Sequence, residues 1–448
     1  MPEPTTMERL LDLAALDTAS LPAEARARAR LSLFDWSVVA RAGASQPLSG
    51  VIRKLVLVEA GRSEATVVGS AGKRVPARAA ALANGTISHA LDYDDTHFGH
   101  IGHLSVGVLP AALAVAERQD LPAICVIEAF LLGAEAACRI GMVLGRRHYE
   151  LGFHQTATAG AFGATIAAGR LLGLQRDQLR NALSLVATRA SGLKSQFGTM
   201  GKPYNAGIAA SNGVEAALLA SYGFISCDDG IAGSQGFLLT HSDDVCEARG
   251  WAELPPDRFV FEDNSYKLHA CCHGTHAMLN ALRELLGGRT FAPAEIAQIQ
   301  VRTNPRWLNV CDIKRPRTGL EVKFSYAMLA AMALRGIDTA SDRSFADTLC
   351  VDRVLLDLAE RVTVDGDPAL SDTATRVMLT FAGGEQREAM HDLADRMPIA
   401  KLQEALQAKA AALLGAAEAE RVWSAIAAID HISAREFASI VLNERSIH

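Results

Sequence analysis

The chain has 448 residues, of which 49% are hydrophobic and 21% charged, and its formal net charge at pH 7 is −6. This composition is typical of a globular protein large enough for two or three domains, and the negative charge excludes a general attraction to nucleic acid. The eight cysteines include no C-x-x-C pair. Their spacing is poor for a metal site or a disulfide framework, so a reducing compartment fits best.

No stretch predicts a membrane span or a cleaved leader. The N-terminal run MPEPTTMERLLDLAALDT has no apolar core, and the most apolar stretch is interrupted by Glu128 and Glu135. We therefore expect a cytoplasmic protein that has no contact with a membrane.

The first 265 residues are rich in alanine and leucine at helical spacing. This periodicity predicts a bundle of helices, and the glycines and alanines on their apolar faces allow close approach. The clearest predicted helices cover residues 25–40, 110–119, 160–174, 176–190 and 212–223.

The pattern changes between about residues 265 and 400. Alternating β-branched runs at 297–303, 360–366 and 375–381 predict strands, among helical stretches at 275–288 and 321–336. Helical periodicity then returns at 400–415, 418–429 and 433–443. The prediction is a mainly α protein, in which a discontinuous all-helical bundle domain (1–266 and 400–448) holds an inserted smaller α+β lid domain (267–399).

Residues 88–105, SHALDYDDTHFGHIGHLS, contain three acids and four histidines. Residues 92–96 fit both the D-x-D-x-T pattern of phosphohydrolases and the D-x-D-D pattern of terpene cyclases. A phosphohydrolase needs its aspartate at the end of a buried strand, and the preceding residues are predicted to be helical. A cyclase needs an aromatic-lined cavity, and only 6% of this chain is aromatic. A Mg²⁺-dependent phosphohydrolase using Asp92 remains an alternative from another class.

A metal site built from His97, His100 and His103 is a further option for this segment. Gly99 and Gly102 interrupt the run, so no helix would align the three imidazoles. We therefore predict no metal site.

Three other segments carry polar groups of catalytic type. His154 precedes a predicted helix start at which Gln155 and Thr156 can satisfy the first amides. Lys202 precedes Pro203, which restricts the backbone around the lysine. The segment YKLHACCHGTHA, residues 266–277, lies at the predicted domain junction, where clefts form.

Each of these residues also has an ordinary explanation that involves no catalytic role. Acids and histidines of a solvated loop serve only capping and solubility, a single lysine is usually on the surface, and cysteines often fill small apolar spaces. A histidine on a helix is often packed in the core. These alternatives apply to Asp94, Asp95, His100, Lys202, Lys267, Cys271, Cys272 and His276.

Several motifs, taken in order along the chain, resemble one family. They are ALANGTISHALDYDDTH, HLSVGVLP, GFH, GTMGKPYNAG with NGVEAALLASYGF, and K-x-x-x-CC-x-x-x-H. Together they resemble the MmgE/PrpD family, which includes 2-methylcitrate dehydratases, cis-aconitate decarboxylases and iminodisuccinate epimerases. The resemblance implies a homodimer without a cofactor and an active site in a cleft between two domains. It also implies site roles for Asp92, Thr96, His103, His154, Lys202 and Lys267.

The chemistry of such a family suits these residue types. Lysines can neutralise the carboxylates of a small anionic polycarboxylate and stabilise developing enolate charge. Histidine suits proton transfer near neutral pH, and a carboxylate such as Asp92 can orient a histidine.

Departures from the family pattern limit how closely the substrate can be identified. Tyr204, Asn205 and Ile208 stand where family members often have histidine or a basic residue. Tyr326 lies two residues before Met328, the position of a tyrosine in several members. Cys272 stands at the position of a catalytic histidine of the decarboxylases, which disfavours decarboxylation of cis-aconitate.

We therefore predict a cytoplasmic, metal-independent lyase or isomerase that abstracts a proton next to a carboxylate, with a 2-methylcitrate-dehydratase-like reaction. The alternatives are an epimerase of an iminodisuccinate-like N-substituted aspartate and a helical interaction protein without activity. The predicted catalytic residues are Asp92, His103, His154, Lys202 and Lys267. The predicted substrate-binding residues are Thr96, Lys202, Lys267, Cys272 and Tyr326.

Overall fold

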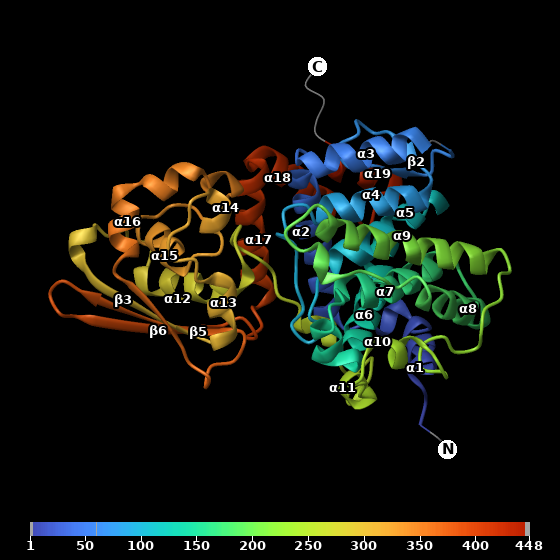
Figure 1. Ribbon diagram of the computed structural model, residues 1–448. Helices are drawn as coiled ribbons and strands as arrows, with labels where there is room; N and C mark the ends of the chain where they lie inside the picture. Colours follow the sequence, from blue (N-terminus) through green and yellow to red (C-terminus); the bar gives the residue numbers. More distant parts are fainter. Residues whose placement is uncertain (1–2, 60, 444–448) are drawn as a thin grey trace. The chain divides into compact units, whose positions relative to one another are not determined.

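The computed structural model describes residues 3–59 and 61–443 of the chain. The chain divides into two compact units, one of Met1–Tyr266 with Ile399–His448 and one of Lys267–Pro398. Figure 1 shows that helices dominate and that strands are few. The prediction of a mainly α fold with a smaller α+β region is confirmed.

The first unit is helical and contains both ends of the chain. Its N-terminal helices are α1 (Thr6–Ala14), α2 (Ala23–Gly43), α3 (Pro47–Glu59), α4 (Ala77–Ser88), α5 (Ser105–Gln119) and α6 (Ile124–Glu150). They are followed by α7 (Gln155–Leu171), α8 (Arg176–Ala187), α9 (Gly201–Ser221), α10 (Phe237–His241) and α11 (Glu247–Trp251). The C-terminal helices are α17 (Ile399–Leu414), α18 (Ala416–Ala427) and α19 (Ala434–Val441), and a short hairpin joins β1 (Ala65–Thr66) to β2 (Arg74–Val75).

The predicted helices of this unit are confirmed, with one extension that affects the site. The helix predicted over 212–223 begins earlier, because α9 starts at Gly201. Pro203 fits there because the first turn of a helix has amides without intrahelical partners. Lys202 and Asn205 are therefore one turn apart on the same helix. Within the described ranges, no helix combines the length and apolarity that a membrane crossing requires.

Glycines bring the central helices of this unit close together. Helix α9 packs on α4, α5 and α7, and α5 packs on α4 and α7; Figure 1 shows these helices together in the first unit. A Cβ atom on Gly85 of α4 would lie 2.9 Å from the Cα of Gly207 on α9. A Cβ atom on Gly163 of α7 would collide with the carbonyl of Gly133 on α6. The predicted close approach through small residues is confirmed, and it places the N-terminal ends of α7 and α9 beside the loop that follows α4.

The second unit combines a small sheet with short helices. Its strands are β3 (Ile296–Thr303), β4 (Val362–Gly366), β5 (Ala374–Phe381) and β6 (Gln386–Asp392), in the order β4-β3-β5-β6. Only the β3–β4 pair is parallel in this sheet. The helices are α12 (His276–Leu286), α13 (Leu308–Cys311), α14 (Gly319–Val322), α15 (Tyr326–Leu334) and α16 (Arg353–Ala359).

Two predictions in this unit need correction. The helix predicted over 321–336 is two helices, because Ser325 takes an extended backbone and caps α15 by accepting a hydrogen bond from the Met328 amide at 3.3 Å. Strand β6 was not predicted. It is a largely exposed edge strand, so its sequence lacks an apolar alternation.

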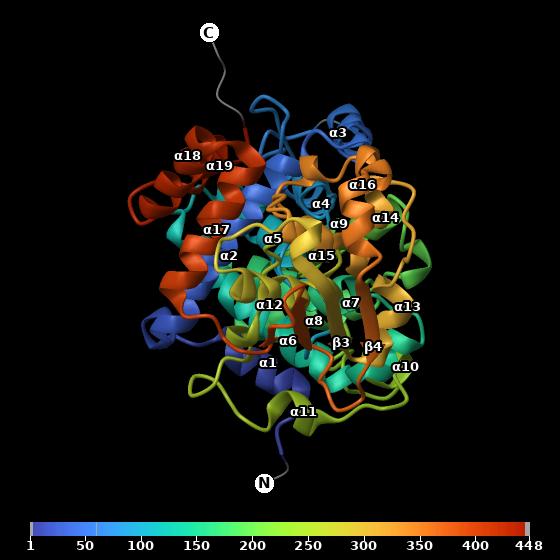
Figure 2. The ribbon, with the colours of Figure 1, turned by 90° about the vertical axis from the view of Figure 1, so that its left-hand side faces the viewer.

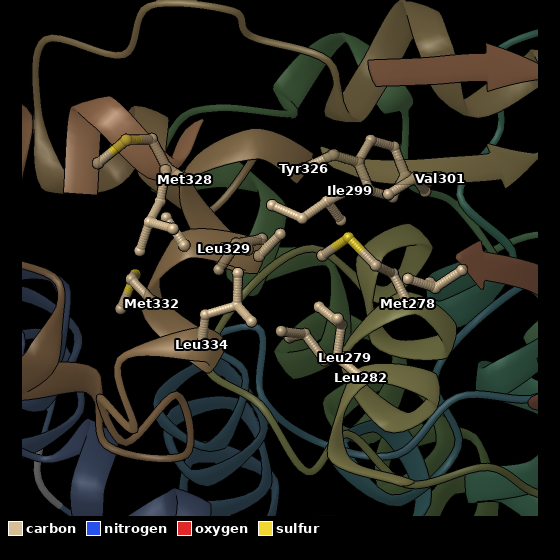
Figure 3. Packing of buried hydrophobic residues seen from close by; sticks show 14 of the residues in the cluster. Met278, Leu279, Leu282, Ile299, Val301, Tyr326, Met328, Leu329, Met332 and Leu334 are labelled. Atoms are coloured by element: carbon tan, nitrogen blue, oxygen red, sulfur yellow. The ribbon is translucent and has the colours of Figure 1, made fainter. Parts of the chain in front are cut away.

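One face of this sheet forms the core of the second unit. Helix α12 packs on β5 and β6, and α15 packs on β4. Figure 2 shows β3 and β4 of this sheet side by side. Figure 3 shows Ile299 and Val301 of β3 pointing toward Met278 and Leu329 of the helices. The opposite face of β3 carries the exposed Arg302. The strands therefore show the alternation that allowed their prediction.

Candidate active site

The loop between α4 and α5 is a folded, buried segment. Its Thr96 pairs in antiparallel fashion with Ser265, through N···O distances of 2.8 and 2.7 Å, and His97 pairs with Gly102. Asp92 has a φ of +51°, a left-handed conformation that few residues except glycine and Asn or Asp adopt readily. The interpretation of this segment as a solvated loop is therefore wrong. Asp94, Asp95 and His100 are all buried.

Asp95 has a structural role at the start of α5. Its carboxylate accepts hydrogen bonds from the backbone N and the Oγ of Ser105, at 3.0 and 2.5 Å, and from Nδ2 of Asn264 at 2.7 Å. These bonds cap the helix and connect it to the segment around Asn264. Burial raises the pKa of Asp95.

His97 and His100 also fix the loop. The His97 Nε2 lies 2.8 Å from the carbonyl of Val260, and its Nδ1 accepts the His100 amide at 2.9 Å. The His100 ring is packed against Gly141, at which a Cβ atom would collide with it, and burial lowers the pKa of His100 to about 3. Among the described residues, the possible metal-ligand group that contains His103 includes neither His97 nor His100, so the alternative in which these three histidines bind a metal is not supported.

Asp94 lies between two imidazoles at the centre of the cluster. Its Oδ1 is 2.7 Å from Nδ1 of His89, and its Oδ2 is 2.7 Å from Nδ1 of His103. Burial acts to raise the pKa of Asp94, but the two histidines outweigh it and hold this pKa well below its usual range. An ionised carboxylate only accepts hydrogen bonds, so Nδ1 of each ring carries a proton.

The protonated Nδ1 of His103 determines what the other side of the ring can do. Burial lowers the pKa of His103 to about 4, although the carboxylate of Asp94 acts in the opposite direction. The ring is then neutral near pH 7, and its Nε2 has a lone pair. This is the protonation state of a general base.

An ion pair lies next to that lone pair. Asp92 Oδ1 is 3.4 Å from Nε2 of His103 and 2.6 Å from Nζ of Lys202. The Lys202 side chain is 16% exposed and that of Asp92 is 47% exposed, so solvent and small anions can reach this pair. A group that takes a proton therefore lies beside a cation that can hold a carboxylate.

His154 is a second histidine at this site. It precedes α7, is buried, and has its ring centroid 6.3 Å from that of His89 and 5.0 Å from that of Phe197. Nδ2 of Asn205 lies 3.1 Å from Nδ1 of His154. Burial lowers the pKa of His154 well below its usual range, and the charge of Lys202 acts in the same direction.

The expected capping of α7 by Gln155 and Thr156 is wrong. Gln155 donates from Nε2 to the carbonyl of Gly141 at 3.0 Å, and Thr156 Oγ1 accepts the backbone amide of His103 at 3.0 Å. Thr156 therefore holds the loop residue His103 against the start of α7.

The cluster also has the composition of a metal site. One ligand atom from each of His89, Asp92, Asp94 and His103 lies within 4.8 Å of the others. Ligand atoms around a tetrahedral Zn²⁺ are separated by roughly 3.4 Å, given metal–ligand distances of about 2.1 Å. The two 2.7 Å contacts of Asp94 are shorter than this: the one with His89 is a hydrogen bond, and the one with His103 is an ion-pair contact. The geometry thus favours a hydrogen-bonded network.

The structure brings four predicted site residues together in the first unit: Asp92, His103, His154 and Lys202. Thr96 follows on the same loop. Sequence reasoning missed His89 and Asn205 and gave Asp94 no catalytic role. The one available signal was the run of acids and histidines, which cannot show which of them meet.

The other predicted residues belong to the second unit. Lys267 is buried, so the expectation of a surface lysine is wrong there. Tyr326 is in the core, and its hydroxyl donates to the carbonyl of Gly274 at 2.8 Å. Cys272 is half-buried. His276 and Cys271 are buried, as a packing role requires.

The chain is similar in sequence to known proteins. A cis-aconitate decarboxylase of Aspergillus terreus is 31% identical over 290 residues, which cover 61% of this chain and 58% of that enzyme. The human cis-aconitate decarboxylase is 32% identical over 164 residues, 35% of this chain and 34% of that enzyme. The matches thus span less than two thirds of these relatives. The MmgE/PrpD N-terminal domain matches residues 13–246 and the C-terminal domain matches residues 269–431, so the chain belongs to the MmgE/PrpD family.

Proposed function

We propose that the protein is a cofactor-independent lyase that acts on a small polycarboxylate by removing a proton from a carbon next to a carboxylate. The observation that carries this proposal is the position of Nε2 of His103, which is 3.4 Å from the carboxylate that Lys202 holds. A base and a cation at this separation suit an acidic C–H bond beside a carboxylate. The similar cis-aconitate decarboxylases act on a substrate of this class, a small polycarboxylate.

The leading reaction is a dehydration like that of 2-methylcitrate dehydratase. Nε2 of His103 takes the proton, and the electron pair of the C–H bond becomes the new C=C bond as the neighbouring C–O bond breaks. The imidazolium then gives its proton to the leaving hydroxide, so water is released and neutral His103 is restored. The carboxylate of Asp94, 2.7 Å from Nδ1, stabilises the imidazolium between these steps.

Lys202 has the complementary task. In the substrate-free protein its ammonium is paired with Asp92 at 2.6 Å. A substrate carboxylate can replace Asp92 at the ammonium, because the side chain of Asp92 is 47% exposed and water can solvate its carboxylate there. The charge of Lys202 then stabilises the enolate character that develops as the proton leaves. The second predicted lysine, Lys267, is proposed to bind a further carboxylate.

Two other reactions use the same first step or the same substrate class. Epimerisation of an iminodisuccinate-like N-substituted aspartate needs the same proton abstraction, followed by return of a proton to the opposite face. Decarboxylation of cis-aconitate is supported by the similarity of the chain to cis-aconitate decarboxylases. Against it stands Cys272, at the position where the resemblance places a catalytic histidine of the decarboxylases.

The test is a product screen by mass spectrometry. The full chain would be incubated with citrate, 2-methylcitrate, cis-aconitate and iminodisuccinate, with His103→Gln as the control. We expect the wild-type protein to remove water from a hydroxy-tricarboxylate and the variant to be inactive. Release of CO₂ from cis-aconitate would show that the reaction is a decarboxylation and not a dehydration. Absence of turnover, together with no rise in melting temperature with any of these compounds, would overturn the proposed function.

A further inference from the structure

The side chain of Asn205 contacts the ring of His154. Its Nδ2 lies 3.1 Å from Nδ1 of His154 and 3.3 Å from the carbonyl oxygen of Leu193. The residue stands on α9 one turn after Lys202 and is buried.

The orientation of the Asn205 amide follows from its second partner. The carbonyl of Leu193 can only accept a hydrogen bond, so the group that faces it must be the NH₂ group. If the amide were turned by 180°, two oxygens would face each other at this distance. The Oδ1 atom instead faces Gly192, where a Cβ atom would come within 3.3 Å of it.

The backbone around His154 holds these partners in place. The His154 amide donates to the carbonyl of Gly192 at 3.0 Å, and the amide of Lys194 donates to the carbonyl of Gly152 at 2.8 Å. Phe153 and Leu193 form an antiparallel bridge. Gly192 has a φ of +149°. The Leu193 carbonyl that orients Asn205 is thus fixed to the same segment that carries His154.

Because an NH₂ group faces Nδ1 of His154, this nitrogen must accept a hydrogen bond. The proton of the neutral ring then resides on Nε2. His103 has the opposite arrangement, since the carboxylate of Asp94 requires its proton on Nδ1. The two imidazoles that the sequence offered as equivalent bases are therefore different tautomers.

The surroundings oppose protonation of His154. A proton on Nδ1 would point at the NH₂ group of Asn205, and the ammonium of Lys202 acts against a second positive charge. Lys202, His89 and His103 act against the charged ring, and Asp92 acts in its favour. His154 thus remains a neutral hydrogen-bond donor near pH 7.

We infer that Asn205 is a positioning residue that keeps His154 as the Nε2–H tautomer, so that His154 donates a hydrogen bond to the negative charge that develops on the substrate while His103 alone takes the proton. This inference rests on the proposed function for its catalytic meaning. The tautomer itself does not depend on any substrate.

The first experiment is therefore made without substrate. Long-range ¹H–¹⁵N correlation spectra of protein labelled with ¹⁵N-histidine would be recorded near pH 7.5, and His103→Gln and His154→Gln would assign the signals. We expect a protonated Nε2 and an unprotonated Nδ1 for His154, and the reverse for His103. A protonated Nδ1 on His154 would overturn the inference even if the protein proves to be active.

The Asn205→Asp variant tests the role of the amide. A carboxylate would require a proton on Nδ1 of His154 and would favour the imidazolium, so the spectrum should change to the charged ring or the other tautomer. We expect kcat to fall at least tenfold and the pH profile to change, because His154 then titrates in the working range. Asn212→Asp on the same helix is the matched control, since Asn212 pairs with Arg189. It should leave the His154 signals and the pH profile unchanged.

Deuterium exchange separates the two histidines once a substrate is known. In D₂O, His103→Gln should abolish exchange at the carbon next to the carboxylate. His154→Gln should slow exchange but retain it, because Gln also donates a hydrogen bond. Exchange that persists in His103→Gln and is lost in His154→Gln would overturn the assignment. If the tautomers are as expected but no compound is turned over, the proposed function fails and the assignment of the protons stands.

Discussion

Nδ1 of His103 lies 2.7 Å from Oδ2 of Asp94, and both side chains are buried in the first unit. Asp94 also holds His89 through its other oxygen at the same distance. A single buried carboxylate thus orients two imidazoles and fixes the lone pair of His103 on the side of the Asp92–Lys202 ion pair.

The Asp94→Asn variant should keep the fold and lose most of its activity. An amide can donate as well as accept, so the tautomer of His103 is no longer fixed and its imidazolium loses a counter-charge. By analogy with other carboxylate–histidine pairs we expect kcat to fall by about a thousandfold or more, with a smaller effect on KM. Asp177→Asn, an exposed change of the same kind, is the control. Activity within threefold of the wild type would show that Asp94 does not orient the base.

The Lys202→Ala variant should lower kcat/KM by about a hundredfold, equivalent to loss of ~3 kcal/mol of transition-state stabilisation. The reason is the loss of the ammonium that is paired with Asp92 and is proposed to receive a substrate carboxylate. Lys54→Ala, which changes an exposed lysine of α3, provides the comparison. Steady-state kinetics with the substrate from the product screen would measure both. A Lys202→Ala enzyme as active as the Lys54→Ala enzyme would remove Lys202 from the site.

Activity should survive exhaustive treatment with EDTA. The two 2.7 Å contacts of Asp94 with His89 and His103 are shorter than the separation of two ligand atoms on one metal ion, so the geometry favours direct contacts between these side chains. Turnover would be measured before and after dialysis against EDTA, with Mg²⁺ and Zn²⁺ added back separately. Loss with EDTA and recovery with Mg²⁺ would favour the phosphohydrolase alternative that uses Asp92.

The Lys409→Met variant should destabilise the first unit strongly. Nζ of Lys409 is 2.6 Å from Oδ1 of Asp35 and donates to the carbonyl of Tyr93 at 2.7 Å, and both side chains are buried. Removal of one partner of a buried ion pair leaves the other uncompensated, at a cost of about 3–5 kcal/mol. Urea unfolding would measure the loss.

Adding Asp35→Asn to Lys409→Met removes the unpaired charge and should restore much of the stability. Activity should remain reduced in the double variant, because the Tyr93 carbonyl between Asp92 and Asp94 has lost its donor. Full activity in a stable double variant would show that Lys409 does not position the loop.

Acid should destabilise the protein, in part through His100. Burial lowers the pKa of His100 to about 3, compared with about 6.5 in an unfolded chain. The unfolded state therefore binds the proton first, and stability is complete above pH ~6.5 and falls as the pH decreases toward 3, by up to about 1.4 kcal/mol per pH unit. In His100→Phe the urea midpoint should fall less steeply between pH 7 and 5. The exposed His431→Phe is the control, and equal slopes in both variants would contradict the assignment.

The sequence by itself determined the class of fold and the chemical character of the site. The 3.6-residue periodicity of α2, α5, α7 and α8 and the alternation of β3 and β5 are local patterns, so they are readable without knowing what packs against them. The edge strand β6 and the break before α15 lack such patterns, and they were missed. The density of acids and histidines in residues 88–105 likewise marked this segment as chemically unusual.

Only the tertiary structure decided what each polar group does. Asp94 and Asp95 are neighbours in sequence, yet one orients His89 and His103 while the other caps α5. The partners of His154 come from α9 and from the segment before it, about 40 to 50 residues further along the chain. A hydrogen bond depends on distances of a few tenths of an ångström and on which atoms face each other. Those are set by how α4, α7 and α9 pack, and a linear pattern of residue types does not contain this information.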